Sequence, residues 1–106
     1  DANMQNREFN STDIHTFNFD CNIQQVKTAE FDILYYGLFF ADKIAIFSMT
    51  SDEVKNCKGY SDKQHKGNIG EGQFHLNRDS IDYHFKNNFK QWLSYEDLYN
   101  IFLKNQ

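Results

Sequence analysis

The chain has 106 residues, of which 40% are hydrophobic and 17% aromatic, including eleven Phe and six Tyr. This content excludes a disordered chain, and the length predicts a single domain over 1–106, either complete or the C-terminal fragment of a longer protein. The net charge of −4 argues against binding nucleic acid through bulk positive charge, although Lys55, Lys58, Lys63 and Lys66 fall within twelve residues.

The N-terminal part is predicted to form a loop and then a β-hairpin. Residues 1–12 are rich in Asn, Asp and Ser, which predicts a loop. Two strand-like runs follow, at 14–19 and 23–28, on either side of Asp20-Cys21-Asn22. Short runs around turn-forming residues are typical of a hairpin.

The next segments are predicted to be a helix and a strand. Apolar residues in 30–40 follow the i, i+3, i+4, i+7 spacing of a helix, although aromatic residues also favour strands. We predict a helix there. The short, mostly apolar run 43–49 predicts a buried strand.

The middle of the chain is polar. Ser51 is suited to cap a short helix that runs through Lys55. Residues 56–73 contain four Gly and almost no apolar anchors, which predicts a long loop. Residues 74–76 predict a brief strand.

The C-terminal part is predicted to be helical. An apolar stripe runs from Ile81 to Leu93 at helical spacing. Ser94 and Asp97 resemble a capping box that opens a last helix. That helix is predicted to turn three apolar side chains inward: Leu98, Ile101 and Phe102.

The two cysteines, Cys21 and Cys57, are too few for a disulfide framework and lack C-x-x-C spacing, which favours free thiols in a reducing compartment. No apolar run approaches the roughly 18 residues that a membrane-spanning helix needs. A cytoplasmic protein is therefore expected.

Gln25 and Lys27 stand one residue apart in a β-prone run, so a regular strand would project both to one face. Asp13 is predicted to lie at the start of the hairpin partner. A carboxylate, an amide oxygen and a lysine suit Mg²⁺-assisted phosphodiester hydrolysis, because Mg²⁺ prefers oxygen ligands and lysine offsets phosphate charge. The alternative is an edge strand with a solvated lysine.

The order of Asp13, a hairpin with Gln25-Val26-Lys27, a helix and the run 41–47 resembles the core of the PD-(D/E)xK nuclease superfamily, in particular bacterial type II restriction endonucleases. The resemblance covers residues 13–49. It implies an α/β fold with a restriction-endonuclease-like core: a small mixed β-sheet, built as hairpin, helix and strand, flanked by helices and followed by a helical C-terminal part.

By this resemblance Asp13 and Gln25 hold the metal and Lys27 positions or activates the water. The sequence departs from the pattern because Gln25 stands where the family more often has an acid, no Pro precedes Asp13, and no upstream helix carries an additional acid. Asp1 and Asp20 remain alternative metal ligands.

The Gly-rich segment and its flanks carry side chains suited to reading DNA. Asn and Gln pair bidentately with adenine, Lys pairs with guanine, and Gly permits close backbone approach. A polar surface loop without a ligand is the alternative. The candidate DNA-contacting residues are Lys58, Lys63, Gln64, His65, Lys66, Asn68, Gln73 and His75.

The sequence disfavours two other sites, a zinc site and a cysteine nucleophile. His65, His75, His84 and Cys57 lack the paired spacing of structural zinc motifs. Nothing in the sequence marks a partner base for Cys57 as a nucleophile.

The sequence thus predicts a Mg²⁺-dependent endonuclease that cleaves double-stranded DNA. The resemblance further implies a homodimer and a cognate methyltransferase in the same system. The alternatives are a non-catalytic DNA-binding or protein-interaction module on the same fold, and an incomplete nuclease fragment.

Overall fold

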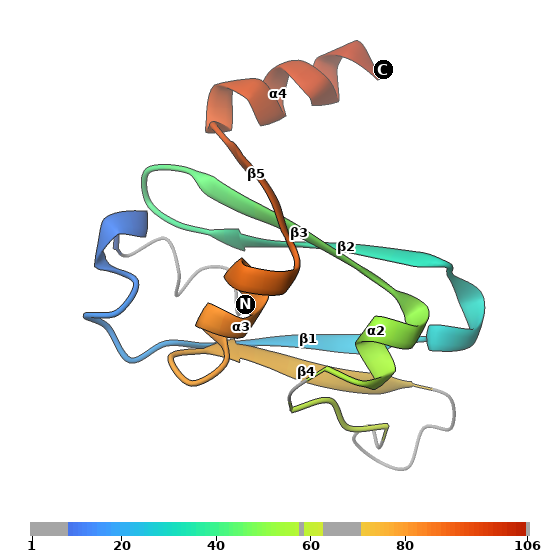
Figure 1. Ribbon diagram of the computed structural model, residues 1–106. Coiled ribbons are helices and arrows are strands. Elements are labelled where there is room, and N and C mark those ends of the chain that lie inside the picture. The colour runs from blue at the N-terminus through green and yellow to red at the C-terminus, as the bar shows by residue number, and fades with distance from the viewer. Residues whose placement is uncertain (1–8, 58, 63–70, 106) are drawn as a thin grey trace.

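The computed structural model describes residues 9–57, 59–62 and 71–105. Within these residues the chain is a small mixed α/β domain with two antiparallel sheets and three α-helices, and the two sheets face each other across the core (Figure 1). The two-stranded sheet contains β1 (Asp20–Val26) and β4 (Gly72–Asn77). The three-stranded sheet has the order β2 (Ile33–Phe39), β3 (Ile44–Thr50), β5 (Phe89–Leu93).

Aromatic side chains from both sheets fill the space between them. Phe47 on β3 stacks on Tyr36 of β2 with ring centroids 5.1 Å apart, and Tyr36 meets the edge of Phe74 on β4 at 5.3 Å. Phe47 and Phe74 are fully buried. Burial of such large rings is the main stabilising contribution that a domain of this size has available.

The predicted strand at 43–49 is confirmed as β3, the central strand of its sheet. The predicted short helix is confirmed as α2 (Ser51–Lys55), but its N-cap is Thr50 rather than Ser51. Thr50 Oγ1 accepts a hydrogen bond from the Glu53 amide at 3.1 Å, and Glu53 Oε1 accepts one from the Thr50 amide at 2.8 Å. This reciprocal capping box starts the helix one residue before the predicted position.

The helix predicted at 30–40 is wrong, because these residues form the short 3₁₀ turn η2 (Thr28–Glu30) and strand β2. β2 pairs with β3 along its whole length, from Ile33 opposite Thr50 to Phe39 opposite Ile44. The apolar spacing of this segment also fits a strand in which aromatic and β-branched residues pack well. Pairing with β3 therefore makes this segment a strand although its apolar spacing also fits a helix.

The hairpin predicted from 14–19 and 23–28 is also wrong. A 3₁₀ turn, η1 (Ser11–Asp13), precedes irregular backbone, and β1 pairs with β4 rather than with 14–19. Ile14 and Phe19 are buried from this irregular segment, so their apolar side chains reach the core without a strand.

The long C-terminal helix predicted from Ile81 to Leu93 is replaced by α3 (Ile81–Asn87) and β5. The break occurs at Asn88, whose carbonyl accepts a hydrogen bond from the Ser48 amide at 3.0 Å. β5 then pairs antiparallel with the free edge of β3. Pairing with β3 gives hydrogen-bond partners to the backbone amides and carbonyls of residues 89–93. The spacing of the aromatic residues in this run, taken alone, predicts a helix.

The last helix, α4 (Tyr95–Lys104), begins at the predicted cap, where Ser94 Oγ accepts from the Asp97 amide at 3.0 Å. The predicted inward packing is wrong: Leu98, Ile101 and Phe102 are 37%, 48% and 64% exposed. α4 extends away from the two sheets at the end of β5 (Figure 1). The helix face that carries these three side chains therefore has no core to pack against in the described chain. None of the described helices is long and apolar enough to span a membrane.

Candidate functional site

Lys27 directly follows β1 and lies between two carboxylates from different parts of the chain. Its Nζ is 3.8 Å from Glu30 Oε2 and 3.9 Å from Glu71 Oε1. The Lys27 side chain is half exposed, whereas that of Glu71 is only 18% exposed. Glu71 reaches this position because the β1–β4 pairing sets Val26 opposite Gly72, the residue after Glu71.

Gln25 does not follow the regular alternation that was expected to align it with Lys27. The pairing register of β1 shifts between Ile23 and Val26, and Gln25 has a φ of 57°, in the left-handed region. A bulge of this kind bends the strand and re-aims side chains, and it is common beside functional sites. The exposed Gln25 side chain is therefore oriented by the bulge and not by strand periodicity.

Asp13 is not brought to Lys27. It lies in η1, beyond the start of β1, while Lys27 follows the end of this seven-residue strand (Figure 1). A strand of that length spans roughly 20 Å. The predicted approach of the two residues required 14–19 to form a strand antiparallel to 23–28, and that strand is absent from the described structure.

Of the predicted DNA-contacting residues, Gln73 and His75 lie on β4, where both project from its outer face. The alternating burial of β4 leaves these side chains partly exposed while Phe74 and Leu76 point into the core. The other six fall outside the described residues: Lys58, Lys63, Gln64, His65, Lys66 and Asn68.

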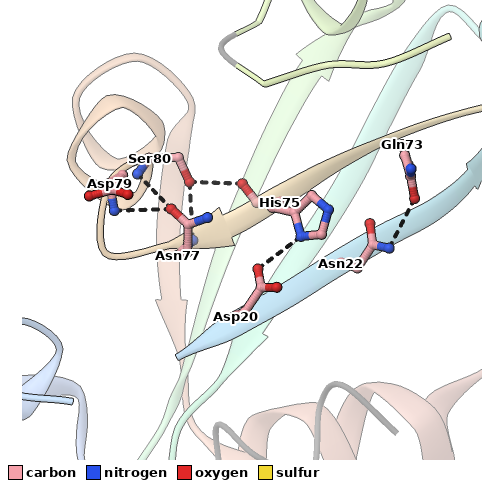
Figure 2. Close-up of polar contacts among 7 residues, drawn as sticks. All are labelled: Asp20, Asn22, Gln73, His75, Asn77, Asp79 and Ser80. Atoms are coloured by element: carbon pink, nitrogen blue, oxygen red, sulfur yellow. Dashed lines mark hydrogen bonds and ion pairs between the residues drawn. The ribbon is translucent and has the colours of Figure 1, made fainter. Parts of the chain in front are cut away.

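Two polar pairs cross between β1 and β4 on this outer face (Figure 2). His75 Nδ1 is 2.8 Å from Asp20 Oδ1, and Asn22 Nδ2 donates to Gln73 Oε1 at 3.0 Å. Cross-strand pairs of this type fix side-chain orientation on a sheet. The outer face thus carries an ordered set of hydrogen-bonding groups.

The turn after β4 is fixed by its own side chains. Asn77 Oδ1 accepts from the amides of Asp79 and Ser80, both at 3.0 Å, and Ser80 Oγ donates to the His75 carbonyl at 2.8 Å (Figure 2). This Asx turn leads into α3. Beside it lies a polar cavity of about 490 Å³ lined by His15, Asn18, Phe19, Asp20, Asn77, Arg78 and Asp79.

A buried polar cluster lies in the core, away from these surfaces. His84 Nδ1 is 2.7 Å from the Tyr36 hydroxyl, which also accepts from Asn88 Nδ2 at 3.1 Å. Burial lowers the pKa of His84 to about 4, so the imidazole is neutral at pH 7. Burial also raises the pKa of Tyr36, against the opposing effect of the Asn88 hydrogen bond.

The disfavoured zinc and thiol sites gain no support. His84 is buried on α3 while His75 lies on the outer face of β4. No three His, Cys, Asp or Glu side chains are placed to hold a metal ion among residues 9–57, 59–62 and 71–105. Burial raises the pKa of Cys57 to about 11, which disfavours the nucleophilic thiolate.

Comparison of the chain with protein-family models, curated proteins and solved structures found no match.

Three partners were missed by sequence reasoning: Glu71 beside Lys27, Asp20 beside His75, and Asn22 beside Gln73. The usable signal was the alternation of polar and apolar residues in 20–23 and again in 72–77. Such alternation predicts two half-buried strands with polar outer faces. It does not say that these strands pair with each other.

Proposed function

We propose that this chain is a DNA phosphodiester hydrolase whose site is centred on Lys27, with Mg²⁺ as cofactor. One observation carries the proposal: Lys27 lies within 4 Å of carboxylates from two separate segments, Glu30 at 3.8 Å and Glu71 at 3.9 Å. A lysine flanked by acids after a strand supports the resemblance of Gln25-Val26-Lys27 to the nuclease motif. In this proposal Glu71 takes the role first assigned to Asp13.

The donor set fits Mg²⁺. Glu30 and Glu71 offer carboxylate oxygens on either side of Lys27, and Mg²⁺ is commonly held by one or two carboxylates together with substrate phosphate and water. When bound, Mg²⁺ supplies polarisation of the phosphate and acidifies a water molecule. Glu30 and Glu71 are the residues that would hold it.

The chain's own groups have distinct roles in this site. The Lys27 ammonium donates hydrogen bonds to a phosphate oxygen and offsets the negative charge that grows during attack. The side chain of Glu71 is more protected from solvent than that of Glu30, at 18% against 67% exposed, so it is the better positioned to orient the attacking water. The bulge sets the direction of Gln25.

The experiment is a cleavage assay on double-stranded DNA in Mg²⁺ with two acid variants. Glu71→Gln should reduce the rate by about 100-fold or more, because it removes a charged oxygen beside Lys27. Asp13→Asn should leave the rate unchanged, because η1 lies at the opposite end of β1. The reverse pattern would return the site to Asp13 and refute the role of Glu71.

A non-catalytic DNA-binding module is the second candidate. It is favoured by the neutral amide of Gln25 and by the ordered polar pairs on the outer face of β1 and β4. This function predicts that Lys27→Ala binds DNA as well as the parent protein and that neither protein cleaves it.

A further inference from the structure

The three-stranded sheet has an apolar face that points away from the core, which we call the open sheet face. Alternate side chains of β2 lie on this face, whereas Tyr36 between them is buried in the core. Ile33 and Tyr35 are 51% and 67% exposed there. Gly37 follows at the next outward position, opposite Ile46 of β3. An apolar sheet face is normally covered by a second layer of structure.

β2 is also an edge strand of this sheet. Its seven residues, Ile33–Phe39, include no charged residue and no proline. Edge strands that face solvent usually carry such residues, because an unprotected edge invites pairing with other chains. The composition of β2 is therefore that of a strand that further polypeptide covers.

α4 carries an apolar surface that suits the open sheet face. With 3.6 residues per turn, its large apolar side chains fall on one side of the helix and residues 96, 97, 100 and 104 fall on the other. A helix patterned in this way normally packs its apolar side on a core or a sheet. The apolar side chains are between 37% and 64% exposed: Leu98, Tyr99, Ile101, Phe102 and Leu103.

The connection to α4 is too short for the helix to fold back over its own sheet. Only Ser94 separates β5 from α4, and its Oγ caps the helix by accepting from the Asp97 amide at 3.0 Å. The Tyr95 hydroxyl donates to the Phe40 carbonyl, and the Tyr95 ring lies 6.5 Å from that of Phe39. Connections between a strand and a helix that packs on its sheet usually have about 2–6 residues. The first turn of α4 is thus fixed, and the rest of the helix extends away from its own sheet (Figure 1).

We propose that two copies of this chain associate by exchanging α4, so that the helix of each copy packs its apolar side on the open sheet face of the other. Each copy offers both surfaces, and exchange of an identical element is a low-cost route to a dimer. Gly37 lies within the open sheet face and, having no side chain, permits close approach of a large helix side chain. This association requires neither DNA nor the proposed hydrolase activity.

The contact area favours exchange over simple pairing of two α4 helices. The five apolar side chains of α4 each leave on the order of 100 Å² open, which gives about 500 Å² per helix. Two helices packed only on each other would bury about 1,000 Å² in total, below the roughly 1,200–2,000 Å² of specific interfaces. Exchange places both helices on sheet faces of similar area, so it buries about 2,000 Å² and reaches this range.

The charges of α4 favour a second copy over a lipid surface. The polar side of the helix carries Glu96, Asp97 and a single cation, Lys104. Helices that lie on membranes are usually rich in Lys and Arg on their polar side, which attract anionic lipids. An acidic helix is not repelled by β2, because this strand has no charged side chain.

The test is sedimentation equilibrium of the parent protein and three variants over a range of concentrations. The parent should form a dimer with a dissociation constant in the micromolar range or tighter. Phe102→Asp on α4 and Tyr35→Asp on the open sheet face should each weaken the dimer by about 30-fold or more, because each buries an unpaired charge in the interface. Asn100→Asp is the matched control, since it adds the same charge to the polar side of the same helix, and it should change nothing.

Mixing the two disruptive variants distinguishes exchange from pairing of α4 with itself. In a mixed dimer, one helix–sheet contact carries both substitutions and the other carries neither. The mixture of Phe102→Asp and Tyr35→Asp should therefore associate more tightly than either variant alone, by about 10-fold or more. A mixture that associates no more tightly than the separate variants would overturn the inference.

Phe102 and Tyr35 are 64% and 67% exposed in the single copy, so their substitution should leave the unfolding of the dilute, monomeric protein nearly unchanged. Ile33→Lys provides a second variant of the open sheet face in case Tyr35→Asp fails to fold, and it should weaken the dimer in the same way. A parent protein that stays monomeric up to about 100 μM would overturn the inference. Co-sedimentation of that monomer with anionic phospholipid vesicles would assign α4 to a membrane surface instead.

Discussion

His84 makes the stability of the fold depend on pH. The side chain is fully buried, and burial lowers its pKa from 6.5 to about 4. The unfolded chain therefore takes up the proton first as the pH falls. The stabilisation is fully present above pH 6.5 and is lost as the pH falls from there toward 4.

The magnitude follows from the two pKa values. Between pH 7 and pH 5 the unfolded imidazole becomes almost fully protonated while the folded one stays mostly neutral. Because one unit of pKa corresponds to about 1.4 kcal/mol, His84 alone should lower the free energy of unfolding by about 2 kcal/mol over this interval. The loss should slow below pH 4, where the folded imidazole also binds a proton.

The assay is urea unfolding at pH 7, 6 and 5 for three proteins: the parent, His84→Gln and His15→Gln. Glutamine does not titrate, so His84→Gln should lose about 2 kcal/mol less than the parent from pH 7 to pH 5. His15 is the control, since its side chain is 64% exposed. Equal pH dependence in the parent and His84→Gln would refute the assignment of a neutral, buried imidazole.

Two further predictions concern the bulge and the core. Gln25→Gly should raise the free energy of unfolding by up to about 1 kcal/mol, because glycine adopts the φ of 57° without strain; chemical unfolding measures this change. Phe47→Ala should lower the free energy of unfolding by about 3–5 kcal/mol, because Phe47 is fully buried. Phe102→Ser should lower it by less than about 0.5 kcal/mol, because Phe102 is 64% exposed. Similar losses for the two variants in thermal unfolding would contradict the packing described for α4.

The parts of the fold that sequence predicted correctly depend on local signals. β3 is a short apolar run between polar residues, and α4 begins at a serine that caps its own first turn. β2 was mistaken for a helix because its apolar spacing fits both periods, and only its pairing with β3 decides between them. β1 was assigned the wrong partner because β4 lies far along the chain and local sequence does not encode that pairing.

The candidate site likewise combines features that local sequence predicts with features that depend on long-range strand pairing. The local motif predicts Lys27 as a site residue within a strand at 23–28, whereas β1 ends at Val26 and Lys27 directly follows it. Its neighbour Glu71 arrives through the pairing of β1 with β4, which no local signal predicts. The orientation of Gln25 depends on a bulge, and a single irregular residue cancels the period-two argument that aligned it with Lys27.

The most direct test of the central claim is the initial rate of DNA cleavage in Mg²⁺ for the parent, Lys27→Ala and Lys55→Ala. The two lysines are closely matched: their side chains are 50% and 52% exposed, and each forms an i,i+3 ion pair. Only Lys27 also meets a second carboxylate, that of Glu71. We predict that Lys27→Ala lowers the rate by about 100-fold or more while Lys55→Ala leaves it unchanged. Equal rates for all three proteins, or no cleavage by the parent, would contradict the account.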